Sequence, residues 1–183
     1  MKKNLLAVLN APCADNEELC AVPYNRDLPS FYFSSFEEYE ERLTVAKQID
    51  LIFHLCGDFE HEVQFIDGEG GQWLVDAFGC NIEGYYEFID ESNSDQIAAL
   101  FYLVTSLGYS IEIALEKVDE VMLTTEALKD YAFDRACESG ELSDFAKMYF
   151  NSEQYAEVLE CNGDVHLFNY DGQEYLVTNH SGL

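Results

Sequence analysis

Lysine and arginine are scarce in this chain of 183 residues, which contains 9 of them and 36 aspartates and glutamates. Residues 48–116 contain neither basic residue, although they include fourteen acidic ones. This scarcity excludes a nucleic acid as a direct ligand, because binding phosphates requires clustered lysine and arginine. The formal charge of -27 at pH 7 instead favours a basic partner.

Proline is also rare, and cysteine follows no framework pattern. All three prolines precede residue 30, while 48% of the residues are hydrophobic and 14% are aromatic, so the acidic residues cover a packed protein. The cysteines include no C-x-x-C pair, which argues against a disulfide framework or zinc ribbon and favours reduced thiols in a cytoplasm. They are Cys13, Cys20, Cys56, Cys80, Cys137 and Cys161.

Long apolar runs are absent as well. Residues 5–9 follow a basic start and imitate a secretory signal, but this run is shorter than the about 7 to 15 apolar residues that such a signal needs. No other run reaches the about 20 apolar residues that cross a membrane as a helix. We therefore expect a cytoplasmic protein with no membrane partner.

Catalytic and metal-binding motifs are missing too. The chain has no G-x-S-x-G, no G-x-x-x-x-G-K-[ST] and no H-E-x-x-H. His54, Cys56 and His61 are close in sequence, but no fourth ligand is spaced to complete a tetrahedral metal site. Residues 90–95 imitate a calcium loop without its turn glycine or its final glutamate, so we expect a polar loop with an N-cap. No enzyme and no cofactor are predicted.

The pattern of apolar residues predicts an α+β fold. In the N-terminal part, an apolar run at residues 5–9 and a proline-containing loop precede a helix that begins at a capping box formed by Ser35 and Glu38. Strands are expected at residues 51–56 and 62–66, before a glycine-rich turn. These elements predict a small sheet with a helix, which we assign to a domain of residues 1–78.

The remainder is predicted to be mainly helical. Helices are expected at residues 96–107, 111–118, 126–139 and 143–150, with another that Ser152 caps. Alternating apolar residues around Asp171 and Gly172 predict a C-terminal β-hairpin. We therefore expect a central helical domain of residues 79–122 and a C-terminal domain of helices and a hairpin, residues 123–183.

Acidic residues in the central part recur at helical spacing. Glu83, Glu87 and Asp90 are three or four residues apart, as are Glu112 and Glu116, so on a helix their Cβ atoms would lie about 5 to 6 Å apart. A row of carboxylates without lysine or arginine can present the field of a DNA strand to a DNA-binding groove. We define the predicted acidic surface as Asp58, Glu60, Glu62, Asp67, Glu69, Asp76, Glu83, Glu87, Asp90, Glu91, Asp95, Glu112, Glu116, Asp119 and Glu120.

Other interpretations of the same residues stay open. The acidic residues are also typical of a solvated helix face, or of a surface that is acidic for solubility and has no partner. A small metal-dependent or cysteine-dependent enzyme would use His54, Cys56 and His61. The aromatic residues among the acidic ones favour core packing, because single-strand binders need a positive groove beside them.

Residues 108–121 have the sequence GYSIEIALEKVDEV. This segment is the best of several in the second half of the chain that resemble the ArdA antirestriction family. Further along, in the family's order, come residues that resemble its antirestriction motif: Leu142, Asp144, Tyr149, Phe150 and Tyr155. The chain departs from the family at Asn151, where an aspartate is usual, and at Val158, while the first fifty residues match poorly.

This resemblance implies an elongated, dimeric protein of three small domains that imitates bent B-form DNA. Its acidic surface would occupy the DNA-binding groove of a type I restriction-modification enzyme and protect incoming mobile DNA. We expect a homodimer with no cofactor. The departures leave open a DNA mimic that is directed at another DNA-binding protein, such as a CRISPR effector or a nucleoid protein.

Overall fold

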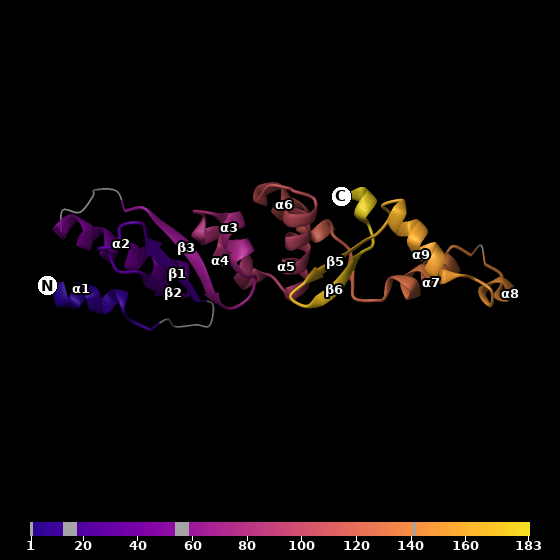
Figure 1. The fold of residues 1–183 in the computed structure, drawn as a ribbon, viewed down its shortest axis with the longest axis horizontal. Coiled ribbons are helices and arrows are strands. Elements are labelled where there is room, and N and C mark those ends of the chain that lie inside the picture. Colours follow the sequence, from indigo (N-terminus) through magenta and orange to yellow (C-terminus); the bar gives the residue numbers. More distant parts are fainter. Residues whose placement is uncertain (1, 13–17, 54–58, 141) are drawn as a thin grey trace. The chain divides into compact units, whose positions relative to one another are not determined.

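The computed structural model describes residues 2–12, 18–53, 59–140 and 142–183, and in these ranges the chain combines helices with two antiparallel sheets of three strands each (Figure 1). The predicted α+β class is therefore confirmed. The chain forms two compact units, residues 1–92 and residues 93–183. The boundaries expected near residues 78 and 122 do not coincide with this division, and the organisation into three domains stays a prediction.

Unit 1 contains a sheet in the order β2-β1-β3. The central strand β1 pairs with both neighbours in antiparallel register, and β3 confirms the strand that was predicted at residues 62–66. The elements of this unit are α1 (Lys2–Leu9), β1 (Glu18–Pro23), β2 (Phe31–Phe33), α2 (Phe36–Phe53), β3 (His61–Asp67), α3 (Gln72–Phe78) and α4 (Ile82–Glu91).

Helix α2 begins where the capping box was predicted. The Ser35 hydroxyl accepts a hydrogen bond from the backbone N–H of Glu38 at 3.2 Å, which satisfies one donor of the first helical turn. One turn later, the buried Arg42 donates to the Tyr32 carbonyl and pairs with the Glu38 carboxylate at 3.5 Å. These contacts fasten α2 to strand β2.

Two predictions in unit 1 are wrong. The strand expected at residues 51–56 does not form at residues 51–53, because α2 continues without a break to Phe53; residues 54–56 lie outside the described part of the chain. The expected proline-containing loop includes strand β1 instead. Pro23 stands at the last position of this strand, where a missing N–H donor does little harm.

The core of unit 1 is aromatic. The ring of Phe33 contacts those of Tyr39 and Tyr86, with centroids 4.9 and 6.3 Å apart, and the Tyr86 hydroxyl donates to the Phe33 carbonyl at 3.3 Å. Tyr85 packs edge-on against Tyr86 at 5.2 Å. Tyr85 and Tyr86 belong to α4, so burial of these two rings holds α4 against the sheet.

Unit 2 contains a sheet in the order β4-β6-β5. The helices that were predicted here are present with shifted ends, and the end of the first one is a π-helix, η1. The cap expected at Ser152 is wrong, because Asn151 caps that helix and Ser152 is its first residue. The elements are α5 (Ser94–Phe101), η1 (Tyr102–Ser106), α6 (Ile111–Lys117), η2 (Val118–Glu120), β4 (Leu123–Thr124), α7 (Leu128–Glu138), α8 (Asp144–Lys147), α9 (Ser152–Cys161), β5 (His166–Tyr170), β6 (Gln173–Val177) and η3 (His180–Gly182).

The predicted hairpin is confirmed and organises this unit. Asp171 and Gly172 have φ angles of 48° and 76°, and positive φ at both positions is what a type I′ turn requires. Because side chains alternate along a strand, Phe168 faces Ala98 and Tyr102 of the α5–η1 segment, whereas Leu176 packs with residues of α7 and α9 on the other face. The hairpin thus lies between these two helical layers (Figure 1).

The C-terminal segment η3 is tied to η1 by hydrogen bonds. The hydroxyl of the fully buried Tyr102 bonds Nδ1 of His180, and the Tyr109 hydroxyl donates to the Leu183 carbonyl at 3.0 Å. Burial, and secondarily Tyr109, raises the pKa of Tyr102 to about 12. The neutral phenol of Tyr102 is therefore favoured in the folded state.

Tyr102→Phe should reduce the loss of stability at alkaline pH. The pKa of about 12 in the folded state lies above the ordinary value of 10.0, so the stabilisation by the neutral phenol is complete below pH 10 and is lost as the pH rises toward 12. Between about pH 9 and about pH 11, we expect the free energy of unfolding in urea to fall less in the variant than in wild type.

The control variant is Tyr24→Phe, because Tyr24 is exposed. It should reproduce the wild-type pH dependence, because this exposed side chain lacks the burial that distinguishes Tyr102. An equal fall in stability for wild type and Tyr102→Phe would contradict the contribution assigned to Tyr102.

Candidate functional site

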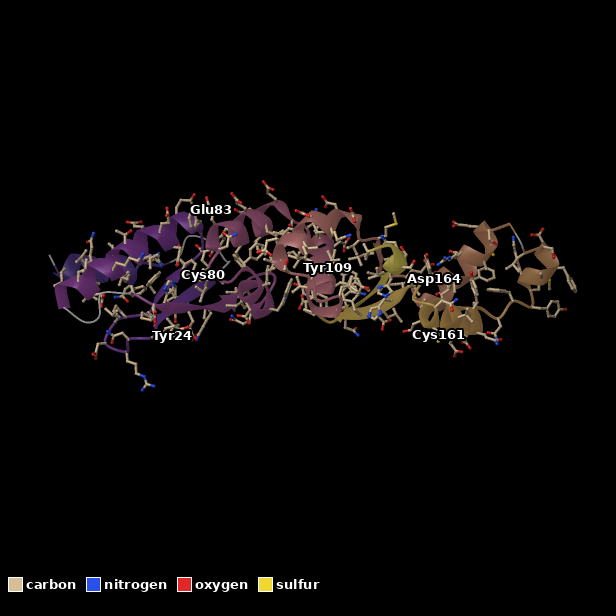
Figure 2. The ribbon with its side chains drawn as sticks, turned by 90° about the horizontal axis from the view of Figure 1, so that it is seen from above. Tyr24, Cys80, Glu83, Tyr109, Cys161 and Asp164 are labelled. Carbon is tan, nitrogen blue, oxygen red and sulfur yellow. The ribbon has the colours of Figure 1, made fainter. Side chains whose placement is uncertain are left out.

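Helix α4 presents part of the predicted acidic surface. Its buried face consists of Ile82, Tyr85 and Tyr86. Asn81 caps the first turn by accepting a hydrogen bond from the Gly84 N–H at 3.1 Å. The opposite face is exposed, and Figure 2 shows Glu83 projecting outward from the helix. The acidic residues on the exposed side are Glu83, Glu87, Asp90 and Glu91.

The linear charge density of α4 is close to that of one DNA strand. A helix of 10 residues is about 15 Å long, so its four carboxylates lie on average about 4 Å apart along the axis. A single strand of B-form DNA carries one phosphate for about 3.4 Å of axis, and the duplex carries twice that density. One such helix therefore matches one strand rather than a whole duplex.

Helix α6 and the following turn η2 present a second part. Ala114 and Val118 are buried, while Glu112, Glu116, Asp119 and Glu120 are exposed. Glu120 is partly neutralised, because Lys117 lies 3.4 Å from its carboxylate.

Local hydrogen bonds fix two of these acidic groups. The pKa of Glu112 lies below its ordinary value, first because its carboxylate accepts from its own backbone N–H and second because Ser110 donates to it. The Gln96 amide donates to the Asp119 carboxylate at 3.0 Å. Hydrogen bonds therefore hold both carboxylates in place beside the helix.

The remaining described members of the acidic surface are exposed as well. Neighbouring amides orient two of them: Gln64 donates to Glu62 at 2.6 Å, and Gln72 donates to Asp76 at 2.8 Å. Asp58 lies outside the described residues. The exposed members beyond α4, α6 and η2 are Glu60, Glu62, Asp67, Glu69, Asp76 and Asp95.

The segment that imitated a calcium loop is a helix cap, as predicted. The Asn93 side chain accepts from the N–H groups of Asp95 and Gln96, each at 3.0 Å, and the Gln96 side chain accepts from the Asn93 N–H at 3.1 Å. This reciprocal pair is a capping box for α5.

Sequence reasoning missed further exposed acidic residues on three helices. They are spaced three or four positions apart, a signal that was available, but Lys129, Arg135 and Lys147 lie among those of the C-terminal part. Because basic residues lie among them, the criterion of a stretch without lysine or arginine does not identify these acidic residues. The missed residues are Glu37, Glu40 and Glu41 on α2, Asp130, Asp134 and Glu138 on α7, and Glu153, Glu157 and Glu160 on α9.

The residues of the predicted antirestriction motif fall into two groups. Phe150 and Tyr155 meet with ring centroids 5.5 Å apart, and Tyr155 packs against the core that Ala132 and Leu159 form. Leu142 is half-buried. In contrast, Tyr149 is exposed, and Asp144 pairs with Lys147 at 3.3 Å on the surface of α8.

Of the candidate metal and thiol residues, the structure describes His61. His61 bonds the Tyr39 hydroxyl at 2.9 Å, and burial lowers its pKa. A cavity of about 320 Å³ adjoins this pair, and the exposed Cys80 is one of its lining residues. Cys80 is labelled in Figure 2. His54 and Cys56 lie outside the described residues. Within the described ranges, no three His, Cys, Asp or Glu side chains form a group that could hold a metal ion.

Comparisons leave the chain without an assigned relative. No protein-family model matches it, and neither does any curated protein or any solved structure. In the part of the chain that the structure describes, no helix combines the length and apolar character needed to cross a membrane. The resemblance to the ArdA family therefore stays a prediction.

Salt should stabilise this protein, because the acidic residues repel one another. Raising NaCl from about 10 mM to about 300 mM shortens the screening length from about 30 Å to less than 10 Å. We expect the melting temperature to rise over this range. The double variant Glu83→Gln, Glu87→Gln should raise the free energy of unfolding at low salt by about 0.2 to 0.5 kcal/mol, the cost of one like-charge pair on a helix.

The control is Asp144→Asn, which should give no such gain, because it removes the partner of Lys147. Thermal denaturation followed by circular dichroism would measure all three proteins. A melting temperature that does not change with salt would contradict the interpretation that the acidic residues repel one another.

Proposed function

We propose that this chain is a DNA-mimicking antirestriction protein. Its acidic surface occupies the DNA-binding groove of a type I restriction-modification enzyme and thereby protects incoming mobile DNA. The observation that carries the proposal is the exposure of every described member of the acidic surface, those of α4 and α6 standing on helices whose opposite faces are buried. A groove lined with cations for phosphates also binds carboxylates at a comparable linear density.

The mechanism is electrostatic competition. The carboxylates of α4 stand on a helix that Tyr85, Tyr86 and the Asn81 cap hold in place, so little backbone conformational entropy is lost when a partner binds them. Charge complementarity accelerates association and makes it weaker at high salt. No covalent step and no cofactor enter this mechanism.

The choice of target rests on the resemblance and on where its residues fold. Residues 108–121, which resemble the ArdA family most, form α6 and η2 with their four exposed acidic groups. The departure at Asn151 does little harm locally, because its side chain caps α9 by accepting the Gln154 N–H at 3.1 Å, and aspartate caps in the same way.

A homodimer belongs to the same proposal. Helix α8 and the residues after it expose an aromatic and apolar group: Phe145 (72%), Met148 (77%) and Tyr149 (72%). The rings of Phe145 and Tyr149 lie 5.2 Å apart. Lys147 adjoins them, so repulsion between two copies is weaker here than at α4.

Phe145→Ser with Tyr149→Ser should therefore convert a dimer to a monomer, because the apolar area that drives the contact is removed. Sedimentation velocity at micromolar concentration would measure the change. Tyr24→Ser, at another exposed tyrosine, should leave the dimer intact. A dimer that persists in the double variant would contradict this contact.

Neutralising five carboxylates should abolish competition with DNA. The variant carries Glu83→Gln, Glu87→Gln, Asp90→Asn, Glu112→Gln and Glu116→Gln, all at exposed positions. Fluorescence anisotropy would measure how well it displaces a labelled duplex from a type I modification enzyme. We expect a loss of at least about 60-fold in apparent affinity, because five charge contacts of about 0.5 kcal/mol or more amount to about 2.5 kcal/mol or more.

The matched control neutralises five exposed acidic residues outside the acidic surface: Asp130, Asp134, Glu153, Glu157 and Glu160. It has the same net charge as the first variant, so a purely global charge effect would weaken both equally. Circular dichroism checks that both remain folded. Unchanged displacement by the first variant, or equal losses in both, would contradict the assigned surface.

A further inference from the structure

Helix α6 exposes two large apolar side chains beside its acidic residues. Ile113 is 46% exposed and Leu115 is 36% exposed. Helix α4 differs, because each of its large apolar side chains is buried or half-buried. The acidic face of α4 is therefore purely ionic, whereas that of α6 is mixed.

The helical geometry puts the apolar side chains on both sides of the carboxylates. Successive residues are rotated by about 100°, so Glu112 and Glu116 point outward within about 40° of each other. Ile113 and Leu115 then lie about 80° to either side of this row, and Ala114 points inward. Because the buried Ala114 is small, α6 packs on its neighbours through this residue while Ile113 and Leu115 stay exposed.

We infer that this mixed face of α6 docks on apolar side chains beside the cations of the target's DNA-binding groove, a contact that DNA itself does not make. This inference rests on the proposed function and adds a source of specificity to it. The occupant is thus a basic protein groove with apolar walls. Ile113 and Leu115 would enter apolar recesses while Glu112 and Glu116 meet lysine or arginine.

Charge decides among the occupants that an apolar face could take. A purely apolar partner would bury Glu112 and Glu116 without counter-charges, which costs several kcal/mol per carboxylate. A second copy of the chain would set the same carboxylates against each other, and an anionic lipid surface would repel them. A basic protein surface satisfies the carboxylates and the apolar flanks together.

The two kinds of contact respond differently to salt. Ionic contacts weaken as salt rises, and DNA loses affinity steeply because it recovers condensed counterions. Burial of apolar area is not screened in this way. The mixed face would therefore let the protein stay bound at salt concentrations at which the duplex dissociates.

The test separates these contributions in one plot of log apparent affinity against log salt. The full-length protein displaces a labelled duplex from a type I modification enzyme between about 50 and 400 mM NaCl. The apolar variant is Ile113→Ser with Leu115→Gln, which keeps the charge and closely matches helix propensity. It should bind about tenfold more weakly at every salt concentration, with an unchanged slope.

Two further variants serve as controls. Glu83→Gln with Glu87→Gln removes only charge, so it should make the slope shallower. Val158→Ser removes an apolar side chain of similar exposure, 45%, from α9 and should match wild type. Circular dichroism at each salt concentration checks that every variant is folded.

The outcomes distinguish the inference from the proposed function. If wild type displaces the duplex and the apolar variant follows the same line, the inference fails and the proposed function stands. The inference would also be overturned if the apolar variant gave a different slope from wild type but the same apparent affinity at high salt. If wild type displaces no duplex at any salt concentration, the proposed function fails and the inference fails with it.

Discussion

Repulsion among carboxylates is the constraint on which the rest of this structure depends. A formal charge of -27 on 183 residues opposes any compact state, so each unit has to bury enough apolar area to overcome it. Unit 1 does so with aromatic rings around Phe33 and Tyr86, and unit 2 with the rings that Tyr102 and Phe168 contribute. The acidic helices thus have one buried and one charged face, and the buried face fixes where the charges stand.

Fixed charges are what a DNA mimic needs. On α4, the Asn81 cap and the burial of Tyr85 and Tyr86 hold the acidic residues in a row before any partner arrives. Repulsion among these charges already opposes folding, so under the proposed function the cations of a partner would relieve it on binding. Helix α6 has exposed apolar side chains beside the same kind of row. We propose that these side chains make a contact with the protein groove that DNA does not make.

Local chemistry made part of the fold predictable. The Ser35 cap of α2, the Asp171-Gly172 turn and the charge pattern of α4 depend on residues close in sequence. Strand β1 was missed because its pairing with β3 joins distant residues and no local pattern reveals it. The exposure of the acidic surface could be predicted from its charge. The exposure of Ile113 and Leu115 could not, because apolar residues at every second position are more typical of a core.

The most direct test of this account is competition between the protein and DNA for one site. Anisotropy of a labelled duplex bound to a type I modification enzyme would be followed as the protein is added, at several concentrations of unlabelled duplex. The account predicts displacement by a near-stoichiometric amount of protein, with an apparent affinity that falls in proportion to the added duplex. Binding that leaves the duplex in place, or no binding at all, would contradict DNA mimicry.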